Sequence, residues 1–147
     1  MLLQSKQKNR SLQAFLLGLL ISGIFLGIYM IQDSGLFLYY GDFNVQQIPF
    51  YQQCHEAIKS GNIFWSWTTD LGANFIGSYS FYLLGSPFFW LTIPFPNNVI
   101  PYLMGPLFIL KFGLAALTGY AFIRRFTRTP DAARLGGILY AFSGFSI

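Results

Sequence analysis

The chain has 147 residues, of which 54% are hydrophobic, 20% aromatic and only 10% charged. Ordinary soluble domains carry roughly 25% charged residues, so this composition indicates an integral membrane protein. The formal net charge of +4 does not indicate nucleic-acid binding, because the basic residues form separate clusters around long apolar runs.

The first predicted element is a membrane-spanning helix. A basic start over residues 1–11 precedes an apolar run over residues 12–31. At a rise of 1.5 Å per residue, this run is long enough to cross a bilayer core of roughly 30 Å. It is too long for the core of a signal peptide and no small-residue cleavage site follows, so we expect a retained anchor. Gly23 and Gly27 have the spacing that lets a second helix approach closely.

Residues 32–98 form the next predicted segment, an external loop that carries two short helices. Pro49 and Gly61 are start and stop signals for a helix over about 49–60. The helical period places Cys54 and His55 on its apolar face, where we expect them to pack rather than bind a metal. A second short helix is expected over about 80–94. The first pattern is typical of a helix that lies in the membrane interface. The second segment is broken by Gly85 and Pro87 and is too short for a clear crossing, so we expect a surface-lying or re-entrant helix there.

The remaining elements set the predicted topology. Residues 99–123 form a second apolar run of spanning length, residues 124–134 form a basic loop, and residues 135–147 begin another apolar run. Basic residues flank the two spans and most of the acids lie between them, which predicts a cytoplasmic N-terminus and an external segment over 32–98. Because the last run is too short to cross a bilayer, we expect a truncated third helix and therefore an N-terminal fragment.

Several segments of the sequence resemble a known family. Gly41-Asp42, the stretch from Gln46 to Tyr51, and the stretch from Gly61 to Trp67 are similar to the start of bacterial YfhO-like membrane proteins. The runs Lys111 to Tyr120 and Leu139 to Gly144 fit the same family. The order of a first span, a long external loop with an early acid and further spans also resembles the first module of the GT-C superfamily of glycosyltransferases.

This resemblance implies an all-α integral membrane fold and a place in the bacterial cell membrane. It implies transfer of a sugar from a polyprenyl-phosphate donor to a cell-envelope polymer, such as lipoteichoic acid, on the outer face. The fragment alone is expected to be inactive. Asp42 matches the first-loop acid of the family, whereas Asn44 stands where some GT-C enzymes have a second acid, so a role for a divalent metal is unsupported.

Five residues are candidates for the site, each with an ordinary alternative. Asp42 could act as the base that takes the acceptor proton, or cap the following helix. Asp70 could bind the acceptor or form a turn, and Trp65 and Trp67 could stack on sugar rings or belong to an aromatic belt at the interface. Lys111, inside the second span, could face the bundle and a lipid phosphate, or extend to the interface.

A different class of function is also compatible with this sequence. A cation inside a span and interrupted apolar segments are features of transporters as well. A polytopic transporter or lipid-translocating protein is therefore the alternative to the glycosyltransferase.

Overall fold

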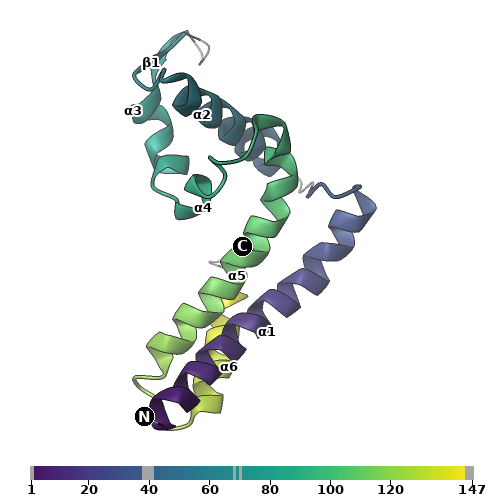
Figure 1. Ribbon diagram of the computed structural model, residues 1–147, viewed down its shortest axis with the longest axis vertical. Helices are drawn as coiled ribbons and strands as arrows, with labels where there is room; N and C mark the ends of the chain where they lie inside the picture. Colours follow the sequence, from purple (N-terminus) through teal and green to yellow (C-terminus); the bar gives the residue numbers. More distant parts are fainter. Residues whose placement is uncertain (1, 38–41, 68, 70, 145–147) are drawn as a thin grey trace. The chain divides into compact units, whose positions relative to one another are not determined.

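The computed structural model describes residues 2–37, 42–67, 69 and 71–144, and their chain is mostly helical (Figure 1). It divides into two compact units. The three-helix unit comprises Met1–Gln32 and Gly105–Ile147, and the inserted unit comprises Asp33–Met104. The inserted unit therefore lies, in sequence, between the two long apolar runs.

Among the described residues, two helices are long and apolar enough to cross a membrane, as the sequence predicts. Helix α1 covers Leu2–Gln32, and an 18-residue window within Arg10–Gln32 has a mean hydropathy of 2.4. Helix α5 covers Ile100–Ile123 and, with the preceding turn, gives a 27-residue candidate span that contains an 18-residue window with a mean hydropathy of 1.7. Large apolar side chains along α1, such as Ile24 and Phe25, are more than 60% exposed, which suits a lipid-facing surface.

Helix α6 covers Pro130–Ala141 and begins earlier than the expected apolar run over 135–147. Thr129 is its N-cap residue, Pro130 occupies the first turn and Asp131 places a negative charge there, and all three favour a helix start. The basic loop expected over 124–134 is thus shorter, because its last residues are helical. The helix ends at Ala141, and part of the predicted range lies outside the described residues.

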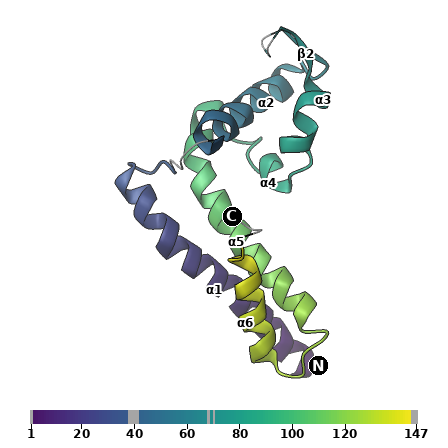
Figure 2. The ribbon, with the colours of Figure 1, turned by 180° about the vertical axis from the view of Figure 1, so that it is seen from behind.

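The three helices pack through small residues, and Figures 1 and 2 show them side by side. On α1 the buried stripe is Ala14, Gly18 and Ser22, spaced four residues apart. A methyl group added at Gly18 would lie 2.9 Å from the Cβ atom of Ala116 on α5. The Ser22 hydroxyl donates to the Gly18 carbonyl at 2.7 Å, which satisfies the buried polar group.

The prediction that a second helix packs closely against Gly23 and Gly27 is wrong for the part of the chain that the structure describes. A methyl group added at either glycine would meet nothing within 4 Å. The stripe from Ala14 to Ser22 takes the partner helices instead, because residues at i and i+4 share a face and Gly23 lies about 100° away from Ser22 around the helix.

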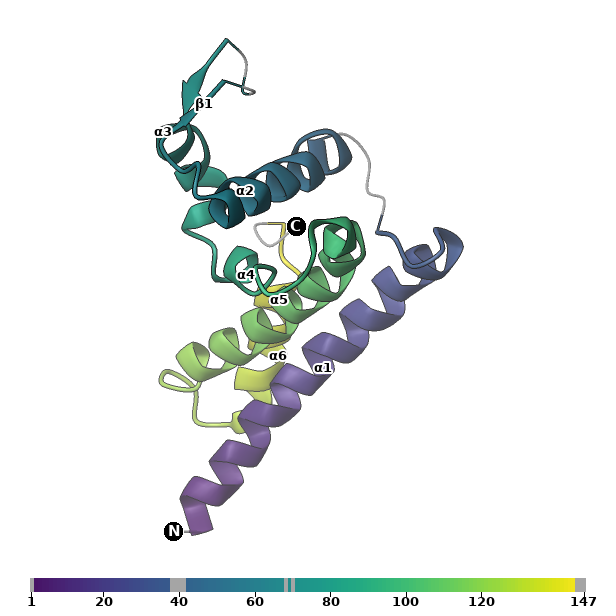
Figure 3. The ribbon, with the colours of Figure 1, turned by 45° about the horizontal axis from the view of Figure 1, so that its top comes forward.

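The inserted unit is built from short elements. Its backbone runs through η1 (Phe43–Gln47, a π-helix), α2 (Ile48–Ser60), β1 (Trp65–Ser66), β2 (Ala73–Asn74), α3 (Phe75–Tyr79), η2 (Ser80–Leu84, a π-helix), α4 (Pro87–Trp90) and η3 (Asn97–Val99). The two strands pair antiparallel, with Trp65 opposite Asn74 and Ser66 opposite Ala73. This hairpin stands out from α2 and α3 (Figure 3).

Helix α2 follows the predicted boundaries closely. Pro49 lies in its first turn, and Gly61 ends it with a left-handed φ of 79°. The predicted apolar face is buried, with Cys54 and His55 fully covered. It packs on a core formed by Phe75, Leu83, Phe89 and their neighbours. Protein therefore covers the face that an interfacial helix would turn to lipid, and a position in the membrane interface stays a prediction.

The expected second helix over 80–94 is divided. The π-helix η2 ends at Leu84, Gly85 follows it, and α4 begins at Pro87 after a turn. Pro87 has no backbone N–H to continue a helix from the preceding turn, which separates the two pieces. The Trp90 indole N–H donates to the Leu84 carbonyl at 2.8 Å and holds α4 against η2.

Candidate functional site

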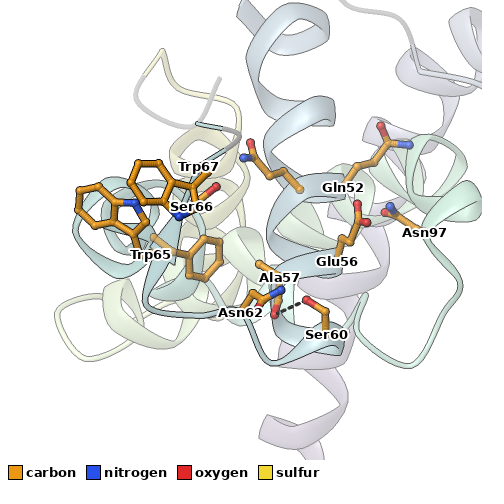
Figure 4. A pocket seen from close by; sticks show the side chains of 11 residues that line it. Gln52, Glu56, Ala57, Ser60, Asn62, Trp65, Ser66, Trp67 and Asn97 are labelled. Atoms are coloured by element: carbon orange, nitrogen blue, oxygen red, sulfur yellow. Dashed lines mark hydrogen bonds between the residues drawn. The ribbon is translucent and has the colours of Figure 1, made fainter. Parts of the chain in front are cut away.

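A pocket of about 920 Å³ opens on the inserted unit (Figure 4). Its floor is the polar face of α2, and its remaining lining comes from the hairpin and nearby turns. The lining residues are Gln52, Gln53, Glu56, Ala57, Ser60, Asn62, Trp65, Ser66, Trp67, Phe75 and Asn97. Amides, hydroxyls, indoles and a carboxylate thus meet in one concave surface, which can offer both hydrogen bonds and aromatic contacts to a polar organic ligand.

The two sides of the pocket differ in chemistry. Figure 4 shows Glu56 and Asn97 on one side of α2, with the indoles of Trp65 and Trp67 on the other. Glu56 is exposed and is the charged residue of the described lining. The Asn97 side-chain oxygen is buried and has no hydrogen-bond partner among the described residues. One side therefore offers the exposed Glu56 carboxylate as a hydrogen-bond acceptor, and the other offers aromatic faces.

A chain of side-chain hydrogen bonds joins α2 to the hairpin and to α3. The Gln53 amide nitrogen donates to the Thr69 hydroxyl at 2.7 Å, and that hydroxyl donates to the Ser66 hydroxyl at 3.0 Å. The Tyr79 hydroxyl donates to the Gln53 amide oxygen at 2.9 Å. Both ends of the Gln53 amide are therefore in use, and this residue links the hairpin to the helix that forms the pocket floor.

The two indoles form a paired aromatic wall. The ring centroids of Trp65 and Trp67 lie 5.6 Å apart at an interplanar angle of 70°. Gly72 passes beneath them with a φ of 104°, and a methyl group added there would lie 3.0 Å from Trp65 and 3.1 Å from Trp67. Trp67 remains 78% exposed. The hairpin turn thus needs glycine both for its backbone conformation and for the close approach of the indoles.

The acids proposed from the sequence do not join this wall. Asp42 is exposed and lies one residue before η1, and it does not line the pocket. Asp70 lies outside the described residues. Glu56, which the sequence analysis did not select, is the acid that lines the pocket together with Trp65 and Trp67.

Lys111 belongs to a different unit from the pocket. It is exposed on α5, with its ammonium nitrogen 5.4 Å from the centroid of the Phe108 ring. The expectation that Lys111 faces a bundle or a lipid phosphate stays a prediction. A cation over an aromatic face is partly stabilised there, which lowers the cost of its place in an apolar helix.

The buried face of α2 does not contribute reactive groups to the pocket. Burial raises the pKa of the Cys54 thiol to about 12 and also raises the pKa of the Tyr51 hydroxyl, which a hydrogen bond with Ser86 partly offsets. The His55 ring nitrogen Nε2 lies 2.9 Å from the Thr92 carbonyl oxygen and has no exposed surface. These three side chains hold the core together, as the sequence predicts for Cys54 and His55.

Sequence reasoning missed Gln53, Glu56 and Asn97 as pocket residues. The available signal was the polar face of the helix over 49–60, which carries two adjacent glutamines and an acid. A polar helix face usually meets solvent, so it indicates a site only when another element is known to wall it. That wall is the hairpin, whose strands are two residues long each.

Comparison with known proteins gives one family and no individual relative. No curated protein and no solved structure matches this chain. The sequence matches the family described as bacterial membrane protein YfhO over residues 14–147. The matched residues include the whole inserted unit and both candidate spans, apart from the first residues of the α1 span. Because this match extends over most of its length, the chain belongs to the YfhO family of bacterial membrane proteins.

Proposed function

We propose that this protein is a membrane glycosyltransferase of the GT-C type. It transfers a sugar from a polyprenyl-phosphate donor to a cell-envelope polymer, such as lipoteichoic acid, on the outer face of the membrane. The main support for this proposal is the pocket of the inserted unit. The segment between the two long apolar helices folds into a concave surface that is lined by amides, a carboxylate and indoles, and such groups can bind a sugar. Membership in a membrane family and two helices of spanning length support a membrane-bound donor.

Contacts within the three-helix unit support the proposed orientation of the protein. The Arg134 guanidinium on α6 donates to the Gln13 side chain on α1 at 2.9 Å and forms a 2.6 Å ion pair with Asp131. Gln13 on α1 and the start of α6 therefore lie side by side, and the end of α5 lies at the same end of the unit (Figure 2). Arg124, Arg125 and Arg128 belong to the segment between α5 and α6. Basic residues favour the cytoplasmic side, which supports a cytoplasmic N-terminus and an external inserted unit.

The proposed reaction needs a base and a leaving group. The acceptor hydroxyl oxygen bonds to the anomeric carbon of the donor sugar, and the bond from that carbon to the phosphate oxygen breaks. The lipid phosphate leaves with the electron pair, and a carboxylate takes the hydroxyl proton. We assign the base role to Asp42, with Asp70 and the two indoles binding substrate and Lys111 contacting a lipid phosphate.

Asp42→Asn tests the base assignment. The amide keeps the size of the side chain but cannot accept a proton, so the transfer rate should fall by roughly 10²-fold or more. Asp33→Asn is the matched control, because it removes the same charge from the same unit at the end of α1. The measurement is sugar transfer from a polyprenyl-phosphate donor by native membranes that contain the full-length protein at matched expression. Equal rates for the two variants would remove Asp42 from the mechanism.

A further inference from the structure

We propose that the pocket binds an uncharged saccharide segment, with Trp65 and Trp67 as its stacking wall and Glu56 as an acceptor for sugar hydroxyls. Gln53 is a positioning residue that holds the wall in place. The inference deepens the proposed function and rests on it only in naming the saccharide as a substrate. The inference concerns ligand binding. It assigns the pocket to an uncharged ligand and assigns phosphate groups to another site.

The charge of the lining argues for an uncharged ligand. Glu56 is the charged group among the described lining residues, and it is an acid. The nearby Lys59 does not line the pocket, because its ammonium donates to the Phe95 carbonyl at 2.6 Å. Residues 33–104 carry one lysine and four acids in total. A phosphate polymer would meet like charges here, whereas a polyhydroxyl ligand can donate to the carboxylate.

The shape and the aromatic wall argue for sugar rings. Exposed indoles present flat apolar surfaces with little side-chain freedom to lose, and the apolar faces of sugar rings can lie on them. The volume of about 920 Å³ is near the upper end of the roughly 300–1,000 Å³ typical of small-molecule pockets. The lining also extends from the indoles across α2 to Asn97 (Figure 4). The pocket therefore suits a segment of more than one sugar.

The hydrogen-bond chain through Gln53 explains how an exposed wall keeps its position. The strands of the hairpin contribute only two residues each, so backbone pairing alone fixes the indoles weakly. The Gln53 amide adds a direct link to Thr69, and through it to Ser66 between the two indoles. Replacing the amide by a carboxylate removes the donor to Thr69 while leaving the size of the side chain unchanged.

Binding to the full chain in detergent micelles tests the proposal. The chain has three tryptophans, so a Trp90→Phe background leaves only the wall as a fluorescence reporter. Cellotriose and chitotriose serve as uncharged probes, and a glycerol-phosphate trimer serves as the anionic probe. We expect a saturable fluorescence change with an uncharged probe and binding of the anionic probe at least tenfold weaker. Glu56→Gln should weaken the binding of the uncharged probes several-fold and reduce the difference in affinity between the uncharged and anionic probes.

Two further variants distinguish a residue that contacts the ligand from a residue that positions the indoles. Trp67→Ala removes a largely exposed side chain and should reduce binding several-fold while the helical circular dichroism stays unchanged. Gln53→Glu should alter the exciton signal of the coupled indoles in circular dichroism as well as reduce affinity. Gln52→Glu is its matched control, since it adds the same charge on the neighbouring residue outside the hydrogen-bond chain, and it should leave the exciton signal unchanged.

The outcomes distinguish this inference from the proposed function. No saturable change with either uncharged probe, or equal binding of the anionic probe, would overturn the inference. Sugar transfer that persists in Trp67→Ala and Glu56→Gln chains with unchanged kinetics would also overturn it. Binding of an uncharged probe by this chain, together with no sugar transfer by the full-length protein, would support the saccharide site and reject the glycosyltransferase.

Discussion

Gly137 on α6 should be among the least replaceable residues of the three-helix unit. A methyl group added there would lie 2.6 Å from the Tyr120 backbone nitrogen, 2.7 Å from the Ala116 carbonyl oxygen and 3.0 Å from the Tyr120 Cα atom. All three atoms belong to the backbone of α5, so no side-chain rotation can relieve the contact. Ordinary van der Waals separation begins at 3.4 Å, and α6 would therefore have to move away from α5 by nearly an ångström.

That displacement sets the expected size of the effect. A gap of about 0.5–1 Å already forfeits a quarter to a half of the attraction between facing atoms. Overpacking of this kind typically costs about 1–3 kcal/mol, and each 1.4 kcal/mol shifts the unfolding equilibrium about tenfold. Gly137→Ala should accordingly lower the free energy of unfolding by that amount, even though alanine is intrinsically a better helix former than glycine.

The adjacent residue provides the control. A methyl group added at Gly136 would lie 2.8 Å from the Cδ1 atom of Ile123, which is the mobile tip of a side chain. Gly136→Ala has the same composition and hydropathy as Gly137→Ala, and it should be neutral or stabilising. The measurement is the helical circular dichroism of the purified chain in mixed micelles as denaturing detergent is increased. Equal midpoints for the two variants would refute the close backbone packing of α5 and α6.

Three other predictions concern the inserted unit and its orientation. Because burial raises the pKa of Cys54 to about 12, the native thiol should react with a thiol reagent at neutral pH far more slowly than in the unfolded chain, and equal rates would contradict its burial. Gly72→Ala should change the exciton signal of the indole pair, because its backbone has a φ of 104° and lies against both rings; an unchanged signal would contradict that contact. In a Cys54→Ala background, Asn44→Cys should react with an impermeant reagent from outside the cell and Arg128→Cys should not, and the reverse result would invert the topology.

Local signals in the sequence predicted the elements that depend on local chemistry. Helix α2 begins and ends as expected because Pro49 and Gly61 act within one turn of each boundary. The start of α6 was missed because the apolar run was used to locate the helix, whereas the N-cap Thr129 and the following Pro130 place its start earlier. Hydrophobicity locates a span, and capping residues locate its ends.

The choice between packing faces could not be made in the same way. Ala14, Gly18 and Ser22 have the same spacing as the pair Gly23 and Gly27, so spacing alone cannot rank the two faces. Only the positions of α5 and α6 decide which face of α1 is covered. Small residues indicate that close packing is possible on a face without identifying the partner helix.

The pocket was least accessible to sequence reasoning. Its two sides come from a helix face and a hairpin, and the bond that joins them links Gln53 to Thr69, which are sixteen residues apart. The strand pairing of Trp65 with Asn74 involves too few residues to produce an alternating pattern. The indoles were predicted as substrate-binding candidates from residue type, but the acid placed in the same pocket is Glu56 rather than Asp42.

The direction in which Asp42 points depends on the number of residues in the π-helix η1. A π-helical run holds one residue more per turn than the α-helix that follows it, and Asp42 precedes this run directly. A substitution within Phe43–Gln47 that preserves the π-helix leaves the acid where it is. Deletion of one residue there would turn it by about 100° around the helix axis. Two family members that differ by a single residue in this stretch can therefore align at the acid and yet present it to different surroundings.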